Sequence, residues 1–286
     1  MKKLKTLLGD YPVTRALRQG LVRSTLVELD IADVKVPHTA FKRVVRGLEF
    51  DVAELAIVTF MMARAFGKPL KLLPAVMFGR FQHPYLVYNV ERGVLSPKDL
   101  EGRRVAIRSS SVTTVAWVRG ILADDHGVDL ERVKWVTFED AHVAEYRDPP
   151  GTERAAEGKT ALGMLLAGEV DAAVLADPVP RDARLKSVIP DPAAAAADWH
   201  RRKGALQVNH MVVVREGLEP ALVREVYRLL RESKRIGAEG AETCPFGMEA
   251  NRRNLEVAID YLYRQKLIPE RCTVDELFDD VTRSLA

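Results

Sequence analysis

Short apolar runs alternate with segments of helical periodicity along this chain, and this alternation constrains the fold more than any other feature. A buried run at 50–60 leads into a helical segment, and another at 70–78 follows Gly67 and Pro69. Strands that alternate with helices are typical of βα units around a largely parallel sheet. The sequence therefore predicts an α/β fold.

The pattern starts again at 96–102, a turn that begins with Ser and ends with Gly. The segments that follow predict a second βαβαβ unit: strands at 104–108, 133–138 and 172–175, and helices at 109–125 and 162–167. The polar or Ala-rich stretches at 147–159 and 190–203 are expected to be surface connections.

The length of 286 residues favours two compact lobes, because a single hydrophobic core usually stops growing below this size. A strand at 208–214 and amphipathic helices at 218–238 and 249–266 are expected to return the chain to the first lobe. We predict that lobe 1 comprises 1–88 and 206–286, and that lobe 2 comprises 89–205.

Composition narrows the class of partner. The formal charge is only +3 and the basic residues are scattered, so no nucleic-acid partner is expected. The apolar runs at 53–65 and 70–81 are too short or interrupted to span a bilayer. The charged start at 1–5 lacks the apolar stretch of an export signal, which predicts a cytoplasmic protein without a membrane partner.

Cys244 and Cys272 have no metal-binding spacing and are expected to be reduced thiols without a catalytic role.

A cluster of hydroxyl side chains lies where a predicted strand meets a predicted helix. It consists of Ser109, Ser110, Ser111, Thr113 and Thr114, directly after Arg108. Backbone N–H groups at a helix start, hydroxyl groups and a guanidinium together favour an anion. A helix cap alone is the other interpretation of these hydroxyl residues.

Other candidates follow apolar strands. Arg80 can bind a carboxylate with its planar fork, and His83 can exchange a proton near neutral pH. His210 lies on the strand expected to return between the lobes. Glu54 is a charged residue in an apolar stretch, so it is expected to pair with a basic group or to accept a ligand hydroxyl. Asp177 also ends an expected strand, but it fits a turn before Pro178 as well as it fits a site residue. His126, His142 and His200 are expected at the surface.

Several stretches together resemble the 4,5-dihydroxyphthalate decarboxylase family, a branch of the type 2 periplasmic-binding-protein fold. They are 9–11 (GDY), 49–55 (EFDVAEL), 81–83 (FQH), 97–105 (PKDLEGRRV), 116–122 (AWVRGIL), 135–137 (WVT) and 245–252 (PFGMEANR). The resemblance covers nearly the whole chain. It departs from the family pattern at Gln82, where Arg is expected, and around 244–248.

The resemblance implies a two-lobed fold of this type, with a ligand cleft between the lobes, and a carboxy-lyase acting on a hydroxylated, phthalate-like aromatic acid. Ring protonation followed by loss of CO2 needs one acid and one anchor, and no cofactor; assistance by a divalent metal ion is left open. We expect His83 to be the general acid, with His210 second, and Glu54 to accept the phenolic proton. Arg80, Arg108 and the hydroxyl residues at 109–114 are the expected carboxylate contacts.

Two other classes fit the same fold. A binding protein that delivers a small organic acid without converting it would use the same anion sites. Enzymes that process menaquinone precursors are also left open, whereas the thiamine-pyrimidine synthases call for a Cys-rich iron site that two distant Cys do not supply. The sequence determines neither the particular substrate nor whether the chain forms a homo-oligomer.

Overall fold

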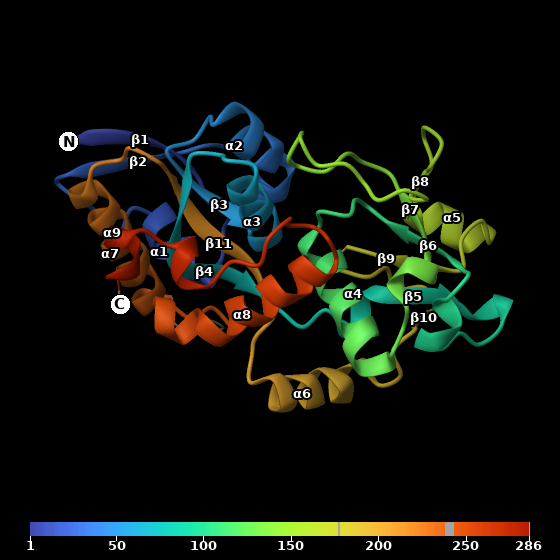
Figure 1. Cartoon of the computed structure of the whole chain (residues 1–286). Coiled ribbons are helices and arrows are strands. Elements are labelled where there is room, and N and C mark those ends of the chain that lie inside the picture. Colours follow the sequence, from blue (N-terminus) through green and yellow to red (C-terminus); the bar gives the residue numbers. More distant parts are fainter. Residues whose placement is uncertain (177, 238–242, 286) are drawn as a thin grey trace. The chain divides into compact units, whose positions relative to one another are not determined.

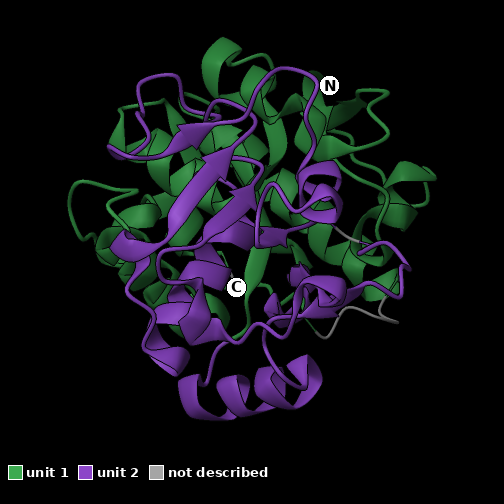
Figure 2. Ribbon diagram, turned by 90° about the vertical axis from the view of Figure 1, so that its right-hand side faces the viewer, with its two compact units in different colours: residues 1–80, 206–286 green, residues 81–205 purple. Residues whose placement is uncertain are grey.

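The computed structural model describes residues 1–176, 178–237 and 243–285 (Figure 1). The chain divides into two compact units, one made of residues 1–80 and 206–286 and the other of residues 81–205 (Figure 2). The junction comes after residue 80, earlier than the predicted 88, because the strand at 86–89 pairs with strands of the second unit. No helix in the described ranges has the length and apolar content that a membrane crossing requires.

Unit 1 contains a mixed five-stranded sheet. Its strands, in sheet order, are β2 (Val27–Ile31), β1 (Lys2–Leu7), β3 (Val52–Ala56), β11 (Val208–Arg215) and β4 (Leu70–Gly79). The first three run parallel, whereas β11 is antiparallel to both β3 and β4. The late strand β11 therefore enters the sheet beside β3, which brings residues near 210 next to residues near 54.

Helices of unit 1 pack on this sheet. They are α1 (Pro12–Arg18), α2 (Phe41–Gly47), α3 (Ile57–Ala65), α7 (Pro220–Ile236), α8 (Met248–Arg264) and α9 (Asp280–Arg283). Helix α7 packs against α1 and β4, and α3 packs against β11. The amphipathic helices expected at 218–238 and 249–266 are α7 and α8; residue 238 lies outside the described residues.

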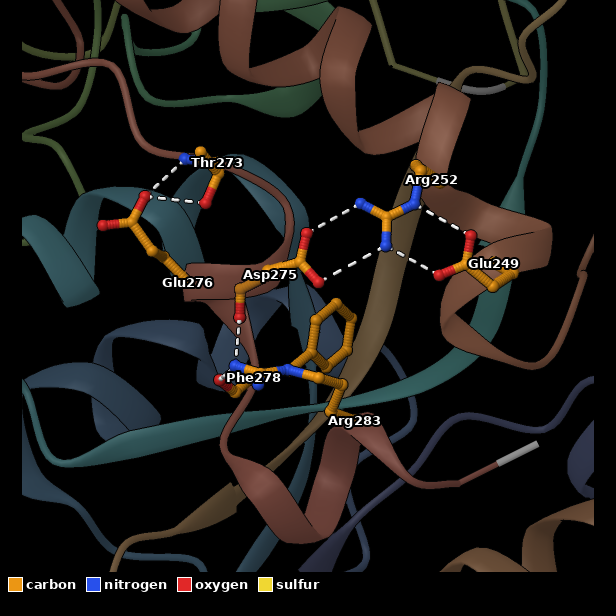
Figure 3. Close-up of polar contacts among 7 residues, drawn as sticks. All are labelled: Glu249, Arg252, Thr273, Asp275, Glu276, Phe278 and Arg283. Atoms are coloured by element: carbon orange, nitrogen blue, oxygen red, sulfur yellow. Dashed lines mark hydrogen bonds and ion pairs between the residues drawn. The ribbon is translucent and has the colours of Figure 1, made fainter.

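The C-terminal segment of unit 1 is held to α8 by Arg252 (Figure 3). Its guanidinium donates to both oxygens of Asp275, at 2.8 and 3.4 Å, and to both oxygens of Glu249, at 2.8 and 2.6 Å. The neighbouring Asn251 is buried and donates to the carbonyls of Pro245 and Gly247. These contacts give the 249–252 stretch a structural role within unit 1.

Unit 2 contains a six-stranded mixed sheet. Its strands, in sheet order, are β10 (Leu185–Ser187), β5 (Leu86–Asn89), β9 (Ala172–Val174), β6 (Arg104–Ile107), β7 (Lys134–Thr137) and β8 (Glu153–Arg154). Strands β6, β7, β8 and β9 form the parallel part, as expected for βα units, whereas β5 is antiparallel to its neighbours. The sequence did not predict β5, β8 or β10, which are short.

The sheet of unit 2 has a hydrophobic core on each face. Along β6, Val105 and Ile107 belong to the core that α4 (Thr113–His126) covers, and Ala106 belongs to the core that α5 (Ala161–Ala167) covers. Successive side chains of a strand point to opposite faces, so this division follows from the pleat. The carboxyl end of β6 leads through residues 108–112 to the start of α4.

The stretch at 190–203 is not the surface connection that the sequence predicted. It contains a helix, α6 (Pro192–Lys203), that starts at Asp191, whose carboxylate accepts from the N–H of Ala194, and ends before Gly204. Trp199 on this helix is fully buried against Trp117 of α4, with ring centroids 5.9 Å apart. Burial of one large aromatic face outweighs the polar composition of the rest of the helix.

Candidate functional site

A carboxylate–imidazole pair lies on the sheet of unit 1. His210 pairs with Ala56 across β11 and β3, so Glu54, two residues earlier on β3, is its diagonal neighbour on the same face. Glu54 Oε1 lies 2.6 Å from His210 Nδ1. The pairing of β11 with β4 shifts in register on both sides of His210, and such bulges re-aim a side chain. Both residues are predicted site residues from the sequence, and the pairing of β11 with β3 brings them together.

Two further donors hold the Glu54 carboxylate. The N–H of Gly9 donates to Oε2 at 2.8 Å, and the phenol of Tyr11 donates to Oε1 at 2.7 Å. Glu54 is fully buried, and both of its oxygens are therefore engaged by the protein. This arrangement does not fit the expected role of Glu54 as acceptor of a substrate proton, because the carboxylate is buried and each of its oxygens already accepts from the protein. It fits a group that orients His210.

Tyr11 is a site residue that the sequence reasoning missed. Burial and the nearby charge of Glu54 raise the pKa of Tyr11 well above its ordinary value, so the phenol stays protonated and donates. A Cβ atom at Gly9 would lie 2.5 Å from the Tyr11 ring, so a glycine here allows the ring to fold back over the end of β1. The Gly-Asp-Tyr sequence directly after the first strand was the available signal.

His210 sits among aromatic rings with one edge accessible. Its ring lies 5.1 Å from that of Phe41 and 5.6 Å from that of Phe78, and 13% of its side chain is exposed. In the described part of the chain, the only hydrogen bond of the imidazole is the one at Nδ1. Nδ1–H held by a carboxylate leaves Nε2 as the atom that can exchange a proton with a ligand.

Arg80 comes directly after β4 in the same unit. Its guanidinium carbon lies 5.2 Å from the centre of the Phe78 ring, which also contacts His210 and stacks on Tyr11 at 5.8 Å. Phe78 thus connects the predicted cation to the carboxylate–imidazole pair through ring contacts.

The hydroxyl cluster of unit 2 lies, as the sequence predicts, at the start of a helix. Ser109, Ser110, Ser111, Thr113 and Thr114 are all buried. The hydroxyl of Ser111 accepts from the N–H of His142 at 3.2 Å and lies 3.3 Å from that of Ser109. Ser110 Oγ and Thr113 Oγ1 have no hydrogen-bond partner among the described residues, and neither caps α4. Buried hydroxyls without partners are costly, so these two fit a ligand better than a cap.

Arg108 has a different surrounding from the one expected. Its Nε atom lies 4.0 Å from Glu139 Oε1, and about a third of its side chain (34%) is exposed. Its backbone carbonyl accepts from the N–H groups of Phe138 and Glu139, which fixes the end of β6. The charge of the guanidinium is therefore partly balanced by the Glu139 carboxylate, which makes Arg108 a weaker candidate for the main anion contact.

His83 belongs to unit 2 and not, as predicted from the sequence, to the same lobe as Arg80. It is fully buried beside Phe81 and Trp199, each with its ring centroid 6.4 Å away. Neither of its ring nitrogens has a hydrogen-bond partner in the described ranges. Burial lowers the pKa of His83 to about 4, so at neutral pH it lacks the imidazolium proton that a general acid needs.

The remaining candidates are distributed as follows. His142 is buried, contrary to expectation, because its loop packs on Ser111, whereas His200 is exposed as expected. Asp177 lies outside the described residues. Cys244 and Cys272 are not joined by a disulfide. Within the described ranges no three His, Cys, Asp or Glu side chains gather in a way that could hold a metal ion.

Comparison with known proteins first defines the class. The alkanesulfonate-binding protein SsuA from Xanthomonas axonopodis pv. citri, solved with MOPS bound, is 14% identical, with 98% of each chain covered and a TM-score of 0.59. A family model described as NMT1/THI5 like matches residues 25–147. The predicted two-lobed α/β fold of the solute-binding-protein type is confirmed.

Two relatives then define the family. The 4,5-dihydroxyphthalate decarboxylase of Pseudomonas putida is 30% identical over 211 residues, which cover 69% of this chain and 81% of the relative. The enzyme of the same name from Comamonas testosteroni is 28% identical over 250 residues, or 82% of this chain and 75% of the relative. The chain belongs to the 4,5-dihydroxyphthalate decarboxylase family, so the expected assignment to a family of carboxy-lyases is confirmed.

Proposed function

We propose that this chain decarboxylates a hydroxylated, phthalate-like aromatic acid such as 4,5-dihydroxyphthalate, without a cofactor. The observation that carries this proposal is the Glu54–His210 pair, with a separation of 2.6 Å, in a chain whose relatives bear the decarboxylase name. The pair supplies an oriented acid, which is what cleavage of an aromatic carboxylate needs.

The reaction starts with the electrons of the ring. A hydroxyl group para to the carboxylate pushes electron density onto the carbon that bears the carboxylate. Nε2–H of protonated His210 transfers its proton to that carbon, and a positively charged or dienone intermediate forms. The bond to the carboxylate then breaks, its electron pair returns to the ring, and CO2 leaves. His210 ends neutral and takes a new proton from solvent before the next turnover.

Glu54 positions the acid in this proposal and does not exchange protons with the substrate. By holding Nδ1–H it fixes the imidazole ring and stabilises the imidazolium form, as a buried carboxylate does for catalytic histidines generally. Tyr11 and Gly9 fix the carboxylate in turn. A positioned general acid contributes about 10²–10⁴-fold, so exclusion of water and orientation of the substrate supply the remainder.

Each unit by itself contains donors suited to an anionic group of a substrate. In unit 2 these are the hydroxyls of Ser110 and Thr113, at the start of α4. In unit 1 Arg80 carries a guanidinium that can bind a carboxylate, and it follows the strand that ends beside His210.

The test is to incubate the protein with 4,5-dihydroxyphthalate while CO2 release and the ultraviolet spectrum are followed. We expect formation of 3,4-dihydroxybenzoate with one CO2 for each molecule consumed, and loss of this activity in His210→Gln. Phthalate, which lacks the hydroxyl groups, should not react. Turnover of neither 4,5-dihydroxyphthalate nor any other para-hydroxylated aromatic acid would contradict the proposal.

A second candidate function is reversible binding of an organic acid without chemistry. The structural similarity to an alkanesulfonate-binding protein favours it, since that likeness concerns the fold as a whole. Binding of 4,5-dihydroxyphthalate that saturates, together with full recovery of the unchanged acid and no CO2, would select this function.

A further inference from the structure

A buried guanidinium in unit 2 has no assigned role so far. Arg119 lies on α4, in the second turn after Thr113, and only 6% of it is exposed. Its guanidinium carbon lies 4.1 Å from the centre of the Trp135 ring, a cation–π contact that fixes the plane of the group. Its Nε atom has no hydrogen-bond partner within the part of the chain described.

The groups around Arg119 are also unpartnered. Tyr146 Oη and Asp148 Oδ1, both on the loop between β7 and β8, are buried atoms without hydrogen bonds to any described residue. Arg119 and Asp148 act on the pKa of Tyr146, which burial raises to about 12, and Ser110 lies beside its phenol. Tyr146 therefore connects the surroundings of Arg119 with the hydroxyl cluster at the start of α4.

The loop is held against that cluster by His142, whose backbone N–H donates to Ser111 Oγ at 3.2 Å. Its residues 141–143 are buried, which fixes the part of the loop that leads to Tyr146. The buried polar atoms of this region that lack a hydrogen-bond partner among the described residues are mainly donors: Arg119 Nε, the Tyr146 phenol and the hydroxyls of Ser110 and Thr113. Asp148 is the one carboxylate among them and balances part of the charge of Arg119.

We propose that Arg119 and Tyr146, together with Ser110, form a buried carboxylate-binding pocket in unit 2, and that Arg119 rather than Arg108 is the principal cation for the ligand in this unit. A buried cation that Asp148 balances only in part, beside several buried donors without hydrogen-bond partners, is unfavourable in the free protein and is compensated by a bound oxyanion. This inference rests on the proposed function for the identity of the ligand as an aromatic carboxylate.

Phthalate is the probe, because it carries the carboxylates but lacks the hydroxyl groups on which the reaction depends. Calorimetric titration of the full chain should show that Arg119→Met weakens phthalate binding by about 100-fold or more, and Tyr146→Phe by about tenfold, as expected for losing hydrogen bonds to a charged group. Lys134→Met removes the same charge from an exposed position next to Trp135 and should leave binding unchanged. Catechol, which lacks a carboxylate, should bind equally to all four proteins.

Thermal unfolding separates a binding role from a structural one. Without ligand, Arg119→Met should melt within about 5 °C of the wild type, because it removes a buried charge that Asp148 balances only in part. A larger fall in the ligand-free melting temperature would show a structural cation and overturn the pocket. Tyr146→Phe keeps the ring in place, so the proposal is testable even if Arg119→Met does not fold.

The proposed decarboxylase function and the proposed carboxylate-binding pocket would be contradicted by different results. If phthalate binds and the variants weaken it, but 4,5-dihydroxyphthalate is not decarboxylated, the pocket stands and the proposed function is wrong. If CO2 is released and both variants keep the wild-type KM and affinity for phthalate within about twofold, the pocket is wrong and the function stands. A wild-type protein that binds neither acid overturns the pocket.

Discussion

His210 Nδ1 and Glu54 Oε1 lie 2.6 Å apart although 156 residues separate them in the sequence. The contact exists because β11 inserts antiparallel beside β3 and places the two side chains on one face of the sheet. Glu54 is fully buried and His210 is largely buried. A hydrogen bond of this kind fixes which imidazole nitrogen faces the carboxylate, and with it the direction in which the other nitrogen can deliver a proton.

The two histidines that the sequence proposed as acids are expected to behave differently. His210→Gln should lower kcat by about 10²–10⁴-fold, since it removes the acid with little change in volume. His83→Gln should keep kcat within about threefold, because a group with a pKa of about 4 is already neutral at pH 7. Steady-state kinetics with 4,5-dihydroxyphthalate at pH 7 decides between them. A larger loss in His83→Gln than in His210→Gln would reverse the assignment.

Tyr11→Phe tests the positioning of Glu54. The variant removes the hydroxyl that donates to Oε1 at 2.7 Å and keeps the ring. We expect kcat to fall by about three- to tenfold with KM unchanged, which corresponds to one hydrogen bond of about 1 kcal/mol. Gly9→Ala should resemble this variant, since its Cβ displaces the Tyr11 ring. An unchanged kcat in both variants would argue for a purely structural phenol.

The hydroxyls at the start of α4 should affect substrate binding and not stability. Ser110→Ala and Thr113→Val remove buried hydroxyls without protein partners, so we expect KM to rise by about three- to tenfold while the free energy of unfolding stays constant or rises by about 1 kcal/mol. Thr160→Ala is the matched control. Its hydroxyl caps α5 by accepting from the N–H of Gly163 at 3.1 Å, so it should cost about 1 kcal/mol and leave KM unchanged. A loss of stability with constant KM in Ser110→Ala would assign that hydroxyl to the fold.

His83 should make the protein less stable in acid. Its pKa is about 4 in the folded state against an ordinary value of 6.5, so the unfolded chain binds the proton more readily between these values. The free energy of unfolding therefore falls as the pH falls from 6.5 to 4, by at most about 3 kcal/mol from this group. Urea unfolding across this range should show a smaller decline in His83→Phe. His38→Gln, which alters an exposed histidine of unit 1, should retain the wild-type decline.

Gly237 is required by a close approach of two helices in unit 1. A Cβ at this position would lie 1.9 Å from the carbonyl oxygen of Pro12, so the end of α7 and the start of α1 meet without room for a side chain. Gly237→Ala should lower the free energy of unfolding by about 2 kcal/mol or more. It should also lower kcat, since α1 follows Tyr11 directly. Gly47→Ala, which has open space around it in α2, should be neutral or stabilising by up to about 1 kcal/mol. Equal stabilities of the two variants would contradict this account.

The candidate site residues that could be recognised from the sequence were those whose residue type and position indicate a chemical role. Arg80 follows a strand, Glu54 and His210 stand within apolar strands, and the hydroxyls at 109–114 lie at a helix start; local sequence shows these positions. Tyr11 and Arg119 were missed, because a tyrosine after a strand and an arginine inside a helix are usually exposed and structurally neutral. Their burial follows from contacts with residues far along the chain.

The sequence by itself determined the α/β class, the order of most strands and helices, the return of the chain to the first unit and the family to which it belongs. Hydrophobic periodicity and short motifs are local properties, so they can be read without the fold. The tertiary structure decided which charged groups meet. The pairing of β11 with β3 joined His210 to Glu54, and the packing of α6 and α4 buried His83 among aromatic rings, where its pKa falls. Proton affinity depends on desolvation and on neighbouring charges, and both are set only once distant segments pack together.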